Sequence, residues 1–184
     1  LTIISSDGIL IDLERSDRVR RVVAIARRCF SNSEIKALLA LPDSERLSRF
    51  YDLWTLKEAY IKASGFGLTF PMRQLSFCFS DDKLSICFAE GIDDDPIKWQ
   101  IWQMSHSSLY KIALAIRSDA QITQFVSRKF LTMSSFQIEA TPIIRSTSKG
   151  CTLSRGQTLE QIWSRRNRQA KKICIWAIST PSAT

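Results

Sequence analysis

The stretch FYDLWTLKEAYIKASGFGL, residues 50–68, carries the side chains best suited to chemistry in this chain. Trp54, Glu58 and Lys62 follow one another at i, i+4 and i+8, so a helix would place them along one face, with Lys57 as a close neighbour. One interpretation is a surface ion pair between Glu58 and Lys62, worth about 0.3–0.5 kcal/mol. The other is a helix that holds a charged substrate.

The strand-like stretch GILIDLER supplies two further carboxylates. Asp12 and Glu14 are two residues apart, so a strand would direct both the same way. If the long helix packs against that face, Glu58 joins them, and three carboxylates without His or Cys suit a hard cation such as Mg²⁺. A solvated strand face is the alternative for Asp12 and Glu14.

Two lysines of the helix extend this hypothesis to the substrate. Mg²⁺ keeps several waters and typically bridges to phosphate oxygens. Lys57 and Lys62 would neutralise such phosphates. Together with the carboxylates they predict a site for a pyrophosphate-containing substrate, in which metal and lysines stabilise charge during phosphoryl transfer.

The hydrophobic pattern predicts the elements that must position these residues. Ser31 and Glu34 have capping-box spacing at the start of a helix, and Gly65 and Gly67 supply a stop for the long one. Beyond Pro71 the apolar residues alternate, which is typical of strands. The expected elements are a strand over 8–15, helices over about 18–29, 31–41 and 43–64, and strands over 75–79, 84–88, 98–104 and 109–117. The fold class is α+β, an antiparallel sheet packed against a long helix.

Residues 1–118 are therefore expected to form one domain and residues 119–184 an extension. Within the extension, 145–158 resembles a linker and 159–172 a basic amphipathic helix. The apolar segment 173–178 either adds a strand or is a simple tail.

Composition limits the class of protein. The chain has 184 residues, and 45% are apolar, enough for a real core. The sequence has no apolar run of about 18 residues, so it predicts no membrane helix. Five Cys with no C-x-x-C pair favour a reducing cytoplasm over a disulfide framework or a zinc site. The net charge of +8 favours anionic partners such as nucleic acid, phosphorylated cofactors or acidic proteins.

Three ordered motifs resemble a known family. DLER after a hydrophobic strand is followed by FS-x-x-E at 30–34, then by W-x-x-K-E-A-x-x-K at 54–62 with G-x-G-L and a Pro after it. This series resembles the 4'-phosphopantetheinyl transferases. It is most similar to the Sfp type, a pseudo-dimer in one chain, and covers roughly residues 8–118 as a C-terminal half of that fold.

The resemblance implies a Mg²⁺-dependent enzyme that moves 4'-phosphopantetheine from coenzyme A to a Ser of an apo acyl or peptidyl carrier protein. It implies that Trp54 packs rather than reacts. The remaining roles it implies are metal ligands at Asp12, Glu14 and Glu58, a general base at Glu58, support of the pyrophosphate and its leaving group at Lys62, and a place near the cofactor for Lys57.

Two departures from the family pattern stand out. Leu10 occupies a position where the family usually has Gly. The Sfp type also has a half of similar size before the strand that carries Asp12, so a missing N-terminal half or a homo-oligomer would complete the cofactor site. The only His, His106, is expected in a surface loop and is not assigned to that half's His motif.

Other interpretations stay open. A truncated, non-catalytic relative would bind carrier protein only. Less favoured is nucleic-acid binding, and a membrane partner is not expected. The acidic carrier helix would meet exposed arginines of the first helix, although a solvated charged face is the alternative for each. The residues concerned are Arg20, Arg21, Arg27 and Arg28 for the carrier, and Arg165, Arg166, Arg168, Lys171 and Lys172, with Trp163 nearby, for nucleic acid.

Overall fold

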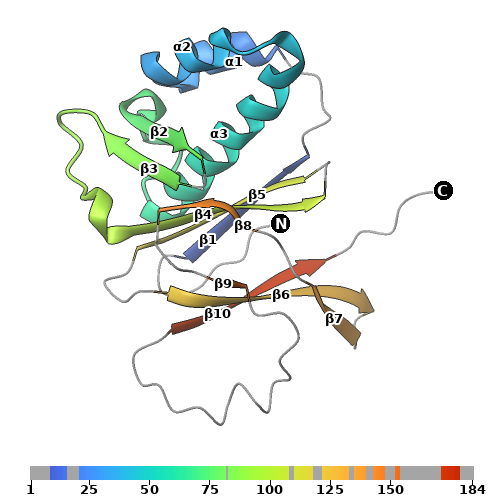
Figure 1. Cartoon of the computed structure of the whole chain (residues 1–184). Coiled ribbons are helices and arrows are strands. Elements are labelled where there is room, and N and C mark those ends of the chain that lie inside the picture. The colour runs from blue at the N-terminus through green and yellow to red at the C-terminus, as the bar shows by residue number, and fades with distance from the viewer. Residues whose placement is uncertain are drawn as a thin grey trace.

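The structure is a computed structural model of the chain, and it combines three main helices with two sheets (Figure 1). It describes residues 9–15, 21–81, 83–107, 110–117, 122–132, 135–139, 143–147, 152–153 and 171–178, and side chains only within 21–67, 69–81, 83–104, 110–117 and 143–147. The helices are α1 (Val22–Cys29), α2 (Asn32–Ala40) and α3 (Asp43–Ser64), with single 3₁₀ turns η1 (Gly67–Thr69), η2 (Met72–Gln74) and η3 (Pro96–Lys98). The strands are β1 (Ile9–Arg15), β2 (Leu75–Ser80), β3 (Lys83–Phe88), β4 (Trp99–Ser107), β5 (Tyr110–Arg117), β6 (Ile122–Thr132), β7 (Ser135–Glu139), β8 (Ile143–Ser146), β9 (Thr152–Leu153) and β10 (Lys171–Ile178).

The larger sheet has six strands in the order β1-β5-β4-β8-β3-β2. Its pairs are antiparallel except for β3 and β8, which run parallel. In Figure 1 the helices cover one face of this sheet and the smaller sheet lies beyond the other. The α+β class and the packing of a long helix on the sheet are as the sequence predicts, while β8 makes the sheet mixed.

Helix α3 is the element that organises the site, and the sequence determines both of its ends. It begins after Pro42 with Asp43 and Glu45 in the first turn, where carboxylates favour the positive end of the helix dipole. It ends at Gly65, which adopts the left-handed conformation with φ of 76°. Its inner face packs on β5 and β1.

Helix α2 begins with a complete capping box, as its spacing predicts. The Ser31 hydroxyl accepts a hydrogen bond from the Glu34 backbone N–H at 3.3 Å, and the Glu34 carboxylate accepts one from the Ser31 N–H at 2.8 Å. The other oxygen of Glu34 accepts the Phe77 N–H of β2 at 2.9 Å. A cap residue that contributes about 1 kcal/mol to a helix therefore also ties α2 to the sheet.

The core lies between α3 and the sheet. Phe30, Phe50 and Trp54 form one aromatic stack, with ring centroids 5.3 and 5.8 Å apart. A second cluster surrounds Tyr60, whose ring centroid is 4.7 Å from that of Trp99. Buried residues also alternate onto the opposite face of β4 and β5, so both faces of these strands are covered. They are Trp102, Met104, Ile112, Leu114 and Ile116.

Tyr60 gives the fold a pH dependence. Its hydroxyl donates to Asp94 at 2.8 Å, and burial, followed by this hydrogen bond and the charge of Asp94, raises the pKa of Tyr60. Above the ordinary tyrosine pKa of about 10, the unfolded chain loses this proton while the folded chain keeps it, so stability falls as pH rises. We expect the wild type to lose unfolding free energy more steeply between about pH 9 and 11 than Tyr60→Phe does. Urea unfolding at each pH measures the two slopes, and equal slopes would contradict this role.

The extension adds strands to both sheets. β10 pairs in parallel with β6 in the smaller sheet, which confirms a strand over 173–178. β8 instead enters the larger sheet between β4 and β3, so part of the segment expected to be a linker is a strand. The basic helix expected over 159–172 lies largely outside the described residues. Among the helices that the structure describes, none is long and apolar enough to cross a membrane.

Candidate functional site

Glu58 and Lys62 lie on the outer side of α3. Their side chains are 22% and 32% exposed, whereas Ala59, Tyr60 and Ile61 between them are buried. The Lys62 Nζ is 3.8 Å from a Glu58 carboxylate oxygen, which is long for a salt bridge and stabilises the helix only slightly. The pair therefore places a carboxylate and an ammonium group, both partly exposed, within the part of α3 that is otherwise mostly buried.

β1 carries the other two predicted ligands, and it lies against α3 (Figure 1). Asp12 pairs with Ala113 of β5, and Glu14 pairs with Lys111. Ala113 belongs to the core beneath α3, and Lys111 forms an ion pair with Asp52 of α3 at 3.0 Å. The backbone of β1 thus pairs with the residues of β5 whose side chains lie on the α3 side of the sheet. The Asp12 and Glu14 side chains lie outside the described residues, so their approach to Glu58 stays a prediction.

Asp52 is a buried acid that the sequence pattern does not single out. Besides the Lys111 ion pair, its carboxylate accepts a hydrogen bond from the Gln103 amide at 2.6 Å. The Gln103 carbonyl oxygen in turn accepts from the Arg145 guanidinium at 2.8 Å. This chain of contacts joins α3 to β5, β4 and β8, so it holds the helix at a set position over the sheet. A carboxylate within the aromatic run FYDLW was the available signal, but its partners are distant in sequence.

Lys57 points into the protein rather than toward Glu58 and Lys62. Its side chain is fully buried, and its ammonium lies 2.9 Å from a Glu34 carboxylate oxygen. It also donates to the backbone carbonyl of Met72 at 2.8 Å and to that of Leu75. Burial lowers the pKa of Lys57, and the nearby Glu34 carboxylate acts in the opposite direction. Lys57 thus lies on another side of α3 than Glu58, because one residue along a helix turns a side chain by about 100°. Its expected place near the cofactor stays a prediction.

The structure also locates Trp54 and the backbone of His106. Trp54 is half-buried and its ring stacks on Phe50, which agrees with a packing role. His106 lies within β4 and not in a surface loop, because β4 continues to Ser107 before β5 begins; its side chain lies outside the described part. Leu10 pairs with Ala115 near the N-terminal end of β1.

The described side chains contain no group of three His, Cys, Asp or Glu residues arranged to hold a metal ion. This observation does not bear on the triad expected from the sequence, because two of its members, Asp12 and Glu14, belong to β1, whose side chains are not described. Of the arginines expected on the first helix, Arg21, Arg27 and Arg28 are exposed, and Arg20 lies outside the described residues.

Comparison with known proteins adds an independent observation. A family model described as "4'-phosphopantetheinyl transferase superfamily" matches residues 8–115. The 4'-phosphopantetheinyl transferase Sfp of Bacillus subtilis (strain 168) is 34% identical over 100 residues, which cover 50% of this chain and 44% of that protein. The 4'-phosphopantetheinyl transferase pptA of Paxillus involutus is 37% identical over 84 residues, covering 44% and 29%. The chain thus spans less than half the length of these relatives.

Among solved structures, a holo-[acyl-carrier-protein] synthase from Thermotoga maritima is similar, with a TM-score of 0.48 and 21% identity. The similarity covers 74% of this chain and 84% of that one. The family match spans β1, all three helices and the strands β2 to β5 almost to its end, which are the elements that carry the candidate site. The chain belongs to the 4'-phosphopantetheinyl transferase superfamily.

Proposed function

We propose that this chain carries the metal and pyrophosphate half of a transferase site. The reaction would move 4'-phosphopantetheine from coenzyme A to a Ser hydroxyl of an apo acyl or peptidyl carrier protein, in the cytoplasm. Family membership supports the reaction class, and the partial exposure of Glu58 and Lys62 beside buried residues of α3 is the observation that carries the assignment of the site. A second half-domain or another copy of the chain would complete the cofactor pocket.

The residues present suit a hard divalent cation. Glu58 offers carboxylate oxygens at the surface of α3, and Asp12 and Glu14 stand on the strand packed beneath that helix. Oxygen ligands of this kind are those that Mg²⁺ prefers in proteins. When bound, Mg²⁺ would neutralise charge on the pyrophosphate of coenzyme A.

The side chains of α3 have separate tasks in this proposal. Glu58 accepts the proton of the attacking Ser hydroxyl, directly or through a water. Lys62, one helical turn away, places its ammonium beside the phosphate that leaves. Lys57 holds α3 in position from inside through Glu34, which belongs to α2. Because the leaving group is already a phosphate, orientation and charge neutralisation supply most of the catalysis.

The carrier protein would dock on α1. Arg27 and Arg28 are exposed in the last turn of that helix, and Arg21 is exposed just before it. Exposed cations on one short helix complement an acidic partner and raise its association rate more than its affinity. The docking surface stays distinct from Glu58 and Lys62, which belong to α3.

A non-catalytic carrier-binding relative is the second candidate. The observation that favours it is that the chain spans less than half of the length of the relatives it matches. Such a protein would keep the α1 docking surface and would transfer nothing.

One assay separates the two candidates. The chain is mixed with an apo carrier protein, coenzyme A and Mg²⁺, and the mass of the carrier is measured by mass spectrometry. The first proposal predicts the added mass of phosphopantetheine, lost with a chelator and restored by Mg²⁺. An unmodified carrier that nevertheless binds the chain would favour the second candidate, and a carrier that neither binds nor gains mass would contradict both.

A further inference from the structure

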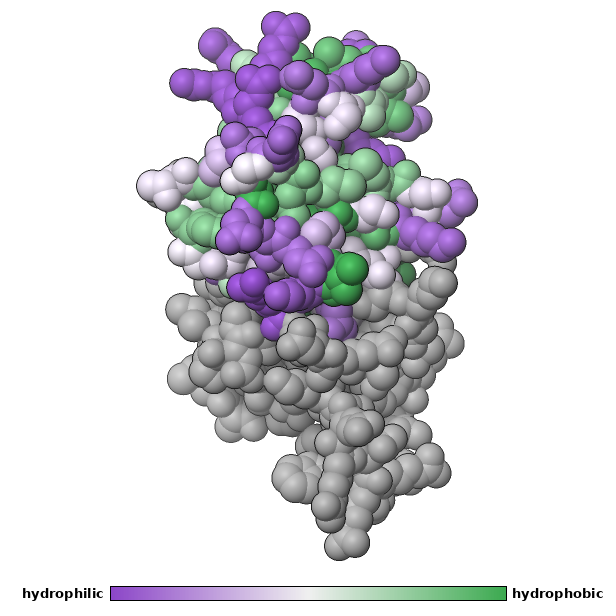
Figure 2. Space-filling model, turned by 90° about the vertical axis from the view of Figure 1, so that its left-hand side faces the viewer, coloured by the Kyte–Doolittle hydropathy of each residue, from purple (hydrophilic) through white to green (hydrophobic). Residues whose placement is uncertain are grey.

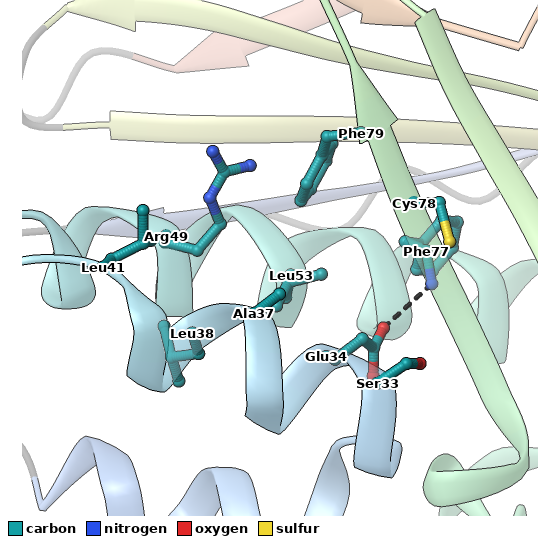
Figure 3. Close-up of a pocket in the computed structure, with 10 residues that line it drawn as sticks. All are labelled: Ser33, Glu34, Ala37, Leu38, Leu41, Arg49, Leu53, Phe77, Cys78 and Phe79. Atoms are coloured by element: carbon teal, nitrogen blue, oxygen red, sulfur yellow. Dashed lines mark hydrogen bonds between the residues drawn. The ribbon is translucent and has the colours of Figure 1, made fainter.

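A groove outside the candidate transferase site runs between α2, α3 and β2 (Figure 3). Its volume is about 390 Å³, at the small end of the range of small-molecule pockets. Most of its wall is apolar, with Leu38 from α2, Leu53 from α3 and Phe77 and Phe79 from β2. Its α3 residues, Arg49 and Leu53, precede Lys57 by eight and four positions and so share a helix face with Lys57, and Glu58 and Lys62 do not line the groove. None of the four wall residues has a role in the proposed transfer.

A positively charged side chain lies at one end of this groove. Arg49 of α3 extends toward Phe79 in Figure 3, and its guanidinium carbon lies 4.4 Å from the centre of that ring. The Nη1 atom of Arg49 is buried and has no hydrogen-bond partner among the described residues. A buried guanidinium N–H without a partner is costly, since charged groups lose the most when desolvated. A ligand that brought an acceptor to the Arg49 guanidinium would relieve this cost.

A second arginine adds to the charge at the same end. The guanidinium carbon of Arg145, from β8, lies 4.9 Å from the Phe79 ring centre. Its hydrogen bonds go to the Gln103 amide oxygen and the Asp81 backbone carbonyl, which are both uncharged. Two guanidinium groups therefore contact one aromatic ring, and neither forms an ion pair with a carboxylate among the side chains that the structure describes.

The acid that lines the groove does not cancel this charge. Glu34 lies toward the other end in Figure 3, with Ala37 and Leu53 between it and Arg49. Its two carboxylate oxygens already accept from Ser31, Phe77 and Lys57. The groove is thus apolar along its length and cationic at one end. Figure 2, which views the side of the molecule where α2 and the β2–β3 hairpin lie, shows hydrophobic surface across the middle of this face.

We propose that this groove binds a small amphipathic carboxylate, with its acyl chain along Leu38, Leu53 and Phe77 and its carboxylate on Arg49. A charge-assisted hydrogen bond in a partly buried site favours an anion over a neutral molecule of the same shape. The apolar wall supplies affinity through burial of the acyl chain. The site is independent of phosphopantetheine transfer and stands whether or not the chain is an active transferase.

Octanoate and 1-octanol are matched probes of this proposal, because they share an alkyl chain and differ in the charged head. Titration of the full chain, followed by calorimetry or by NMR shifts of the groove residues, should show saturable binding of octanoate. Arg49→Met should weaken octanoate binding by about tenfold or more and leave octanol binding unchanged. Ala37→Phe fills the groove and should abolish the binding of both.

Arg28→Met is the control, since it removes an exposed arginine that is not part of the groove. It should leave octanoate affinity as in the wild type, and Arg49→Lys, which keeps the charge, should retain part of the affinity. Circular dichroism melting confirms that each variant is folded. Absence of saturable binding, equal affinity for octanoate and octanol, or equal effects of Arg49→Met and Arg28→Met would overturn the proposal. Binding of an acidic peptide but not of octanoate would overturn it as well.

Discussion

Glu58→Gln is expected to lower phosphopantetheine transfer by at least about a hundredfold while leaving the fold intact. The substitution keeps the shape of the side chain but removes a negative charge that the proposal uses both as a metal ligand and as a proton acceptor. Loss of the Glu58–Lys62 contact alone costs little stability, because that contact is 3.8 Å long and both side chains are partly exposed. The measurement is the initial rate of carrier modification by mass spectrometry, with urea unfolding in parallel.

Glu45→Gln is the matched control for this result. Glu45 is an exposed acid in the first turn of the same helix, so its replacement changes the charge of α3 equally without touching the proposed site. The control should keep the wild-type rate. A Glu58→Gln variant with wild-type activity would remove Glu58 from the site, and a loss that is equal in both variants would point to helix charge alone.

Lys57→Met is expected to reduce the free energy of unfolding by about 3–5 kcal/mol. The ammonium is fully buried and bonded to Glu34 and two backbone carbonyls. Its removal leaves the Glu34 carboxylate without its buried cation at the junction of α2, α3 and β2. Because most natural domains are stable by only about 5–15 kcal/mol, the loss is a large fraction of the total. Urea unfolding followed by tryptophan fluorescence measures the loss.

The second variant that tests this pair is the double substitution Glu34→Gln with Lys57→Met. The Glu34→Gln side chain carries no charge but can still accept a hydrogen bond from the Phe77 or Ser31 N–H group, so the double variant should be more stable than Lys57→Met alone. Lys36→Met, at an exposed lysine of α2, should change stability by less than about 0.5 kcal/mol. A double variant no more stable than Lys57→Met would show that the charge pair is not what Lys57 contributes.

The helices and the β2–β3 hairpin could be predicted from the sequence because their signals are local. The capping box at Ser31, the start after Pro42 and the stop at Gly65 each depend on a few neighbouring residues, and the structure has all three. Strand β8 is different, since its place between β4 and β3 depends on pairing with residues tens of positions away. Short strands with nonlocal partners leave little trace in periodicity.

The candidate site was predictable in part for the same reason. Helical spacing predicts that Glu58 and Lys62 share one side of α3, and there both side chains are partly exposed. The same spacing does not predict which side of the helix is buried. Lys57 lies on the buried side, where its ammonium forms an ion pair with Glu34 of α2. Asp52 was missed since a buried carboxylate is recognised by its partners. These are Gln103, which lies 51 positions away in sequence, and Lys111, which is more distant still.

Binding of Mn²⁺ in the presence of coenzyme A, observed by electron paramagnetic resonance, tests the central claim most directly. The claim is that Glu58, on α3, and Asp12, on the strand beneath it, hold one divalent ion, and this measurement does not require the chain to complete a reaction. We predict binding that Mg²⁺ displaces and that Glu58→Gln and Asp12→Asn each weaken by at least about tenfold. Mn²⁺ affinity that is the same in the wild type and in both variants would contradict it.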